Sequence, residues 1–181
     1  MLAYLFVAIA VLWRVMLSIF PHPLGFTPVA ASLLFFGANV DRKRFWVPML
    51  LLVASDLWLT PEYYGYKITA DHFVTWAWYA AMLGLGSLLK QNSKPVRILG
   101  ASLAASVSFF LVSNLAVWAV WNMYPKTLAG LLQCYAAAVP FFRNGLGGDL
   151  VFTAAFFSVP LLVKAFRSES PSRVATDRLI R

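Results

Sequence analysis

The sequence predicts an all-α integral membrane protein with six transmembrane helices and a further short helix between the fifth and the sixth. Hydrophobic residues make up 61% of the 181 residues and charged residues 12%, against about 25% charged in soluble proteins. The apolar residues fall in six runs that alternate with polar segments. Three basic clusters lie between or after these runs and share one side of a six-span arrangement: Arg42–Arg44, Lys90–Arg97 and Lys164–Arg181.

The placement of charge also predicts the orientation and the domain organisation. A formal net charge of +8 is typical of many nucleic-acid-binding proteins, but here the charges flank apolar runs and form no single patch, so no nucleic-acid partner is expected. Basic loops mark the cytoplasmic side of a membrane protein, so we expect both termini there. The chain is expected to form one membrane domain, residues 1–166, followed by a basic cytoplasmic tail, residues 167–181.

The first span, Leu2–Phe20, is predicted to be retained, because it has no basic start and no cleavage site before the prolines that follow it. Arg14 lies inside this span. An arginine inside a bilayer is costly, so its side chain is expected to reach the interface, find an acidic partner or contact a ligand.

The second apolar run, Pro28–Val40, is short. It has about 13 residues, or roughly 20 Å of helix at about 1.5 Å per residue, which does not cross a hydrocarbon core of about 30 Å. The segment before it, residues 21–28, contains three prolines and cannot be helical. We therefore expect that segment to dip below the outer surface, where it would line a pocket with His22 at the rim. The alternative is that His22 is only the polar tip of a loop.

The third span, Phe45–Leu59, carries an acid within the membrane. Asp56 lies about 11 residues, or roughly 16 Å, from the cytoplasmic start of the span. A carboxylate at that depth is costly unless it is paired, so Asp56 is either a functional residue or the structural partner of Arg14 or of a helix N-terminus.

The loop that follows, residues 60–70, contains three tyrosines, including Tyr64. Tyrosines at this level form either an interfacial belt or the walls of a pocket. Asp71 is suited to cap the fourth span, His72–Leu89. His72 lies in the first turn of that span, where its side chain can point inward.

The fifth span, Val96–Trp121, begins with small residues spaced four apart, which favour close helix contact. Asn114 and Trp118 follow one turn apart. An amide inside a membrane needs a hydrogen-bonding partner, so Asn114 is either a link between helices or a ligand contact.

The stretch Tyr124–Asp149 is the most informative part of the chain. Its central run, Thr127–Phe142, has about 16 residues, or roughly 24 Å of helix. If that run crossed the membrane, the basic tail would lie opposite the other basic loops. We therefore expect an interfacial or re-entrant helix, a turn at Gly145–Gly148, and a sixth span, Asp149–Phe166, capped by Asp149.

Cys134 lies in the middle of the slimmer face of this predicted helix and is the only cysteine, so no disulfide can form within the chain. The small residues around it indicate either close helix packing or a cavity wall. The other candidate residues of this stretch are two tyrosines and the polar group near its end: Tyr124, Tyr135, Arg143, Asn144 and Asp149.

Three segments resemble a family of small bacterial inner-membrane proteins of unknown function that carry a transport-protein label. They read PHPLGFTPVAASLLFFGA, ASDLWL and SNLAVWAVWNMYPKTLAGLLQCYAAAVPFFRNGLGGDLVFTAAFF. The resemblance covers nearly the whole chain, and residues 114–149 are its most specific part. It implies a multi-pass protein of the bacterial inner membrane.

More distantly, the layout is similar to the substrate-binding (S) components of energy-coupling-factor vitamin transporters. That family has six helices, a second helix that begins TP(V/I)A and ends in GA, a long loop between helices five and six, and an outward pocket. The similarity implies uptake of a vitamin-like micronutrient, energised by a partner module of ATPases and a coupling membrane protein, or uptake without such a module. The small-residue motif with which S components contact the coupling protein is only approximated here, by Ala3, Ala8 and Ala10.

The sequence therefore favours a membrane carrier or solute-binding protein over an enzyme. Aromatic residues would stack on the solute, and histidine, asparagine and arginine would fix its polar groups. One alternative is an intramembrane enzyme with Cys134 as nucleophile and a histidine as base. The other is a metal- or corrinoid-binding protein that uses Cys134 or a histidine, although these ligands lack short-range spacing. The sequence assigns no cofactor and no metal, and it contains no phosphate-binding G-x-x-x-x-G-K loop for ATP hydrolysis.

Overall fold

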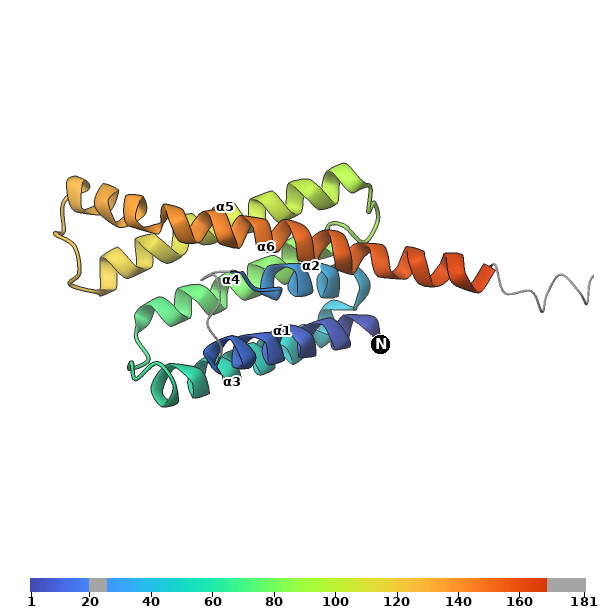
Figure 1. The fold of residues 1–181 in the computed structure, drawn as a ribbon, viewed down its shortest axis with the longest axis horizontal. Coiled ribbons are helices and arrows are strands. Elements are labelled where there is room, and N and C mark those ends of the chain that lie inside the picture. Colours follow the sequence, from blue (N-terminus) through green and yellow to red (C-terminus); the bar gives the residue numbers. More distant parts are fainter. Residues whose placement is uncertain (20–25, 169–181) are drawn as a thin grey trace, which may run out of the picture.

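The protein is a bundle of six α-helices with one short 3-10 helix, seen in a computed structural model that describes residues 1–19 and 26–168 (Figure 1). Expectations for the proline segment up to residue 25, for His22 and for the tail after residue 168 lie outside the described residues. No strand occurs in the described part. The helices are α1 (Leu2–Ile19), α2 (Val29–Asn39), η1 (Arg42–Arg44), α3 (Trp46–Glu62), α4 (Ala70–Ser87), α5 (Pro95–Val120) and α6 (Leu128–Ser168).

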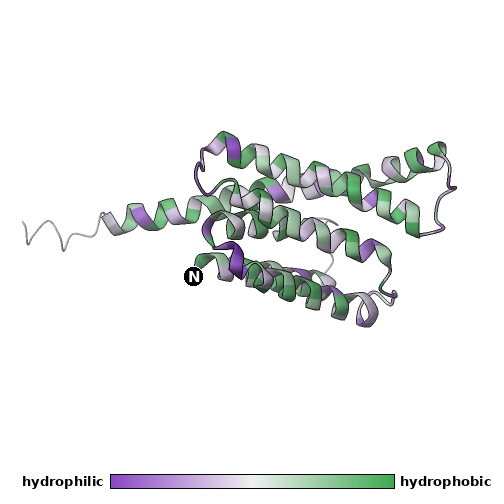
Figure 2. Cartoon of the chain, turned by 180° about the vertical axis from the view of Figure 1, so that it is seen from behind, coloured by the Kyte–Doolittle hydropathy of each residue, from purple (hydrophilic) through white to green (hydrophobic). Residues whose placement is uncertain are grey.

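Apolar helices make this chain a membrane protein. Of the helices in the described ranges, α1, α5 and α6 are long and apolar enough to cross a bilayer, and α2 is a shorter apolar helix. Hydrophobic residues cover much of the helix surface (Figure 2), and many large apolar side chains point outward, such as Leu12, Leu111 and Leu162. Outward-facing apolar side chains at this density suit lipid rather than water.

Helix α6 is one continuous helix of 41 residues. The sequence predicts a separate interfacial or re-entrant helix, a turn at Gly145–Gly148 and then a new span, and the predicted turn is wrong. In an apolar environment backbone N–H and C=O groups must be paired within the chain, and an unbroken helix pairs them locally even where it contains glycine and proline. The helix includes both Pro140 and Pro160.

The length of α6 exceeds the thickness of a bilayer. Its 41 residues correspond to roughly 61 Å of helix, about twice a hydrocarbon core. Figure 1 shows the last turns of α6 projecting beyond the other helices. The remainder of α6 runs antiparallel to α5, and the two helices lie side by side along α5.

Helix α2 forms the centre of the bundle. All ten residues from Val29 to Ala38 are buried, and the helix contacts α1, α4, α5 and α6. A helix that is apolar all round is stable only when it is surrounded, so its short length does not prevent it from forming the core.

Two glycines bring α2 and α4 into backbone contact. A Cβ atom on Gly37 would lie 2.3 Å from the carbonyl oxygen of Leu83, and one on Gly86 would lie 2.4 Å from that of Leu34. No side chain fits at either position. This close approach fixes the spacing between the two helices.

The basic loops meet at one end of the bundle, here called the basic end. Lys90 forms an ion pair with Asp41 at 2.9 Å, and this contact holds the pKa of Asp41 below its ordinary value. Arg42 donates to Ser87 at 3.0 Å, and Arg44 donates to Tyr4 of α1 at 3.3 Å. The clustering agrees with the predicted grouping of the first two basic clusters.

Candidate functional site

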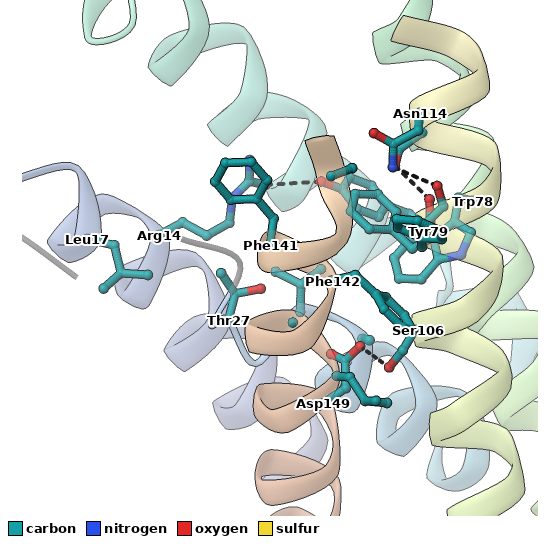
Figure 3. A pocket seen from close by; sticks show the side chains of 18 of the residues that line it. Arg14, Leu17, Thr27, Trp78, Tyr79, Ser106, Asn114, Phe141, Phe142 and Asp149 are labelled. Carbon is teal, nitrogen blue, oxygen red and sulfur yellow. Dashed lines mark hydrogen bonds between the residues drawn. The ribbon is translucent and has the colours of Figure 1, made fainter. Parts of the chain in front are cut away.

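A cavity of about 440 Å³ lies between α1, α4, α5, α6 and the start of α2 (Figure 3). We call it the first cavity. Its walls are mostly aromatic and aliphatic, with a few polar groups that converge on it, which is the usual composition of a small-molecule site. The aromatic lining comes from Tyr64, Trp78, Tyr79, Phe109, Phe110, Phe141 and Phe142, and the polar lining from Arg14, Thr27, Ser106, Ser113, Asn114 and Asp149.

Arg14 lines the first cavity, and its charge is neutralised by Asp56, which lies outside the cavity. One guanidinium nitrogen forms an ion pair with Asp56, and the other donates to Ser55 at 3.1 Å and to Tyr79 at 3.2 Å. The second carboxylate oxygen of Asp56 accepts a hydrogen bond from the indole of Trp76 at 2.9 Å. These contacts use three of the five guanidinium donors.

Asp56 is therefore the structural partner of Arg14, one of the two roles that its depth in the span predicts. Its side chain is 8% exposed, against 19% for Arg14, and it does not line the first cavity. A buried pair of this kind is stable only because both ions keep further hydrogen bonds. The pair joins α1 to α3 and fixes the orientation of Arg14.

Asp149 lines the first cavity from the middle of α6. The sequence predicts that it caps the start of a helix, and that role is wrong because α6 begins at Leu128. Ser106 of α5 donates a hydrogen bond of 2.6 Å to one carboxylate oxygen (Figure 3). Within the described residues Ser106 is the one hydrogen-bond partner of this carboxylate, so the other oxygen can accept from a ligand.

Two further predicted residues line the first cavity. Tyr64 reaches it from the loop after α3. Asn114 reaches it from α5, where its amide nitrogen donates to the Phe110 carbonyl at 2.7 Å and leaves the amide oxygen as an acceptor (Figure 3).

His72 has a structural role at the start of α4. Its Nδ1 accepts a hydrogen bond from the backbone N–H of Thr69 at 3.3 Å, and its Nε2 lies 3.2 Å from the Thr60 hydroxyl. The first contact belongs to a capping box that begins α4. His72 does not line the first cavity.

Four other predicted residues hold α5 and α6 together or lie in their connection, and none lines the first cavity. Cys134 is 3% exposed and lies 3.5 Å from the Asn114 carbonyl. Tyr135 donates to the Leu111 carbonyl at 2.8 Å, and Trp118 donates to the Pro125 carbonyl at 2.9 Å. Tyr124 lies in the connection between the two helices.

Arg143 and Asn144 are exposed on the side of α6 that faces away from the first cavity. On a helix, neighbours of Phe142 at one and two positions point in other directions than Phe142 itself. The sequence predicts that both residues contact a solute, and the structure does not bring them to the first cavity.

Several cavity residues are not identified by the sequence. Ser106, Trp78 and Tyr79 lie within apolar spans, and only tertiary packing brings them together. The signal for Ser106 is its place in the small-residue run of the fifth span, which predicts a close helix contact. The pairing with Asp149 is the product of that contact.

No metal site is formed by the described residues: they contain no group of three or more His, Cys, Asp or Glu side chains placed to hold an ion. His22, which the metal alternative includes, lies outside the described residues. In the described part of the chain Cys134 contacts a backbone carbonyl and has no histidine base beside it.

The chain belongs to a family of unknown function (DUF6580), whose profile matches residues 1–171. No curated protein and no solved structure matches the chain.

Proposed function

We propose that this protein binds a small solute in the first cavity and carries it across the membrane. One observation carries the proposal: a cavity of about 440 Å³ with aromatic walls and convergent polar groups, inside a bundle of apolar helices. Pockets for small organic molecules usually measure about 300–1,000 Å³ and have this mixture of surfaces.

The lining indicates the chemical class of the solute. Aromatic side chains from α4, α5 and α6 offer ring faces on which a planar group can stack. Arg14 is already paired with Asp56, whereas Asp149 has an oxygen left to accept a hydrogen bond. The preferred solute is therefore a ring-bearing molecule with at least one hydrogen-bond donor, a description that includes many vitamin-like micronutrients. We place the protein in the bacterial inner membrane, with its basic end in the cytoplasm.

The first helix argues against docking of an energy-coupling module at its alanines. Ala3 and Ala10 are buried in the protein's own core, and only Ala8 is exposed. A small-residue surface must be accessible to pack against another helix. We therefore favour a carrier that works without that module.

The test is to purify the protein in mild detergent and to identify the bound solute by mass spectrometry in the wild type and in a blocked variant. Gly145 lines the first cavity, so Gly145→Phe places a ring inside it. We expect this variant to lose about ten-fold or more of the bound solute, because the added ring occupies volume that the solute would fill.

Gly147→Phe is the matched control. It lies two residues further along α6, and a Cβ there meets nothing within 4 Å, so the variant should retain the solute. Equal retention by Gly145→Phe and by the wild type would exclude the first cavity as the binding site.

Replacing the cysteine tests the enzyme alternative. Because Cys134 is 3% exposed and lies outside the first cavity, Cys134→Ala should retain the wild-type amount of solute. A bound compound that the wild type converts and Cys134→Ala leaves unchanged would show that the cysteine acts as a nucleophile.

A further inference from the structure

A second cavity of about 480 Å³ lies nearer the basic end, between α2, α5 and α6. It shares no lining residue with the first cavity. No charged side chain lines it, and its polar groups are hydroxyls and one amide. Its walls include Phe35, Asn39, Ser93, Leu99, Phe157 and Ser158.

Two buried hydroxyls in the wall of the second cavity lack partners. The hydroxyl oxygens of Ser102 on α5 and Thr153 on α6 are buried and have no hydrogen bond within the described part of the chain, and the two residues are 1% and 2% exposed. Nearby serines of α5 do bond: Ser108, for example, donates to the Ala105 carbonyl at 3.0 Å. A buried hydroxyl without a partner is costly and calls for water or a ligand.

The Ser102 and Thr153 hydroxyls lie next to the Ser106–Asp149 hydrogen bond of the first cavity, along the same two helices. Ser102 lies one helical turn from Ser106 on α5, and Thr153 lies one turn from Asp149 on α6. Because α5 and α6 run antiparallel, the Ser106–Asp149 pair and the Ser102 and Thr153 positions form two successive steps of one seam. The first step lines the first cavity and the second step lines the second cavity.

We propose that the second cavity is filled with water and forms the part of the solute path nearest the basic end. The Ser106–Asp149 contact is then the barrier that separates the second cavity from the first. This inference rests on the proposed carrier function. The second cavity takes water and an uncharged hydrogen-bonding solute, because its lining offers no counter-charge to an ion. A lipid chain would suit the apolar walls but would offer no hydrogen-bonding group to the hydroxyls and the amide of the lining.

Cysteine accessibility tests whether the second cavity holds water. The chain has a single cysteine, so Cys134→Ala gives a cysteine-free background. Ala154 and the adjacent Ala155 are both exposed on α6, but only Ala154 lines the second cavity. A charged thiosulfonate reagent that cannot cross the membrane, added to one face of sealed vesicles at a time, reacts only with an ionised thiol in contact with water.

We expect Ala154→Cys to react from the basic end about ten-fold or more faster than Ala155→Cys, since thiols in apolar surroundings stay protonated and unreactive. Equal, slow rates for the two variants would overturn the proposal and show a lipid-filled groove. Neither rate requires a solute, so this result is independent of the mass-spectrometric test of the carrier function.

A third cysteine tests the barrier. Ser113 lines the first cavity, and with the barrier closed Ser113→Cys should react only from the face opposite the basic end. Adding Ser106→Ala removes the hydrogen bond to Asp149 and should raise labelling from the basic end about ten-fold, on the scale of one hydrogen bond to a charged group. An unchanged rate would show that the Ser106–Asp149 contact is not the barrier.

Discussion

Asp56→Ala is expected to lower the free energy of unfolding by about 3–5 kcal/mol, the cost of removing one partner of a buried ion pair. The Arg14 side chain is 19% exposed, and the variant leaves its guanidinium without a counter-charge. It also removes the acceptor of the Trp76 indole. Reversible unfolding in mixed micelles, followed by circular dichroism, measures the change.

Two controls separate the charge from the local packing. Asp41→Ala breaks the exposed pair with Lys90 and should leave stability unchanged, because solvent screens exposed pairs. The double variant Arg14→Met with Asp56→Leu should recover most of the loss, since it removes both charges and keeps the volume. An equally small effect of Asp56→Ala and Asp41→Ala would show that Arg14 does not depend on Asp56.

Gly86→Ala is expected to destabilise the protein by about 1–3 kcal/mol or more, the usual cost of added volume in a packed core. The new methyl group would lie 2.4 Å from the Leu34 carbonyl oxygen. That atom belongs to the backbone of α2 and cannot turn aside as a side chain can. The two helices must therefore separate, which can be measured as a lower melting temperature in detergent.

Gly84→Ala on the same helix is the matched control. A Cβ at Gly84 meets nothing within 4 Å, so this variant should melt at or slightly above the wild-type temperature, because alanine favours the helix over glycine. A lower melting temperature for both variants would point to a general effect of glycine replacement in α4.

The sequence predicts the apolar helices well and includes the Arg14–Asp56 pair among its alternatives, because both follow from the cost of placing each residue in an apolar environment. Runs of apolar residues show the helices directly. Asp56 and Arg14 each carry a charge that the membrane does not tolerate alone, so their pairing is among the few choices open to them. The short second run predicts a helix that does not cross the membrane alone; α2 has 11 residues and is surrounded by other helices, a position that the run length does not predict.

The continuity of α6 could not be predicted from local signals. Gly145 to Gly148 reads as a turn in water, and the charge rule favours a break before the last span. The environment decides otherwise, since unpaired backbone groups cost more in apolar surroundings than glycines cost in a helix. In one continuous helix Ala138, Phe142 and Asp149 face the same cavity. A prediction that breaks the helix between them cannot show that they share a face.

For a related reason, only part of the lining of the first cavity could be predicted. Tyr64, Asn114 and Asp149 line the first cavity. Each can be recognised in the sequence because it is a polar or amphipathic residue in an apolar region. Ser106 and Ser102 carry no charge and can bond to their own helix, so the sequence gives no reason to single them out. Their importance arises only from the register of α5 against α6.

The glycine contact between α2 and α4 has a consequence for movement. Residues near the start of α2 line the first cavity and residues near its end line the second, so α2 borders both cavities. The same helix is in close backbone contact with α4 at Gly37 and Gly86. A carrier needs one wall that stays still while another shifts. We expect α2 and α4 to be the stationary wall, and the hairpin of α5 and α6 to be the part that swings when the passage opens.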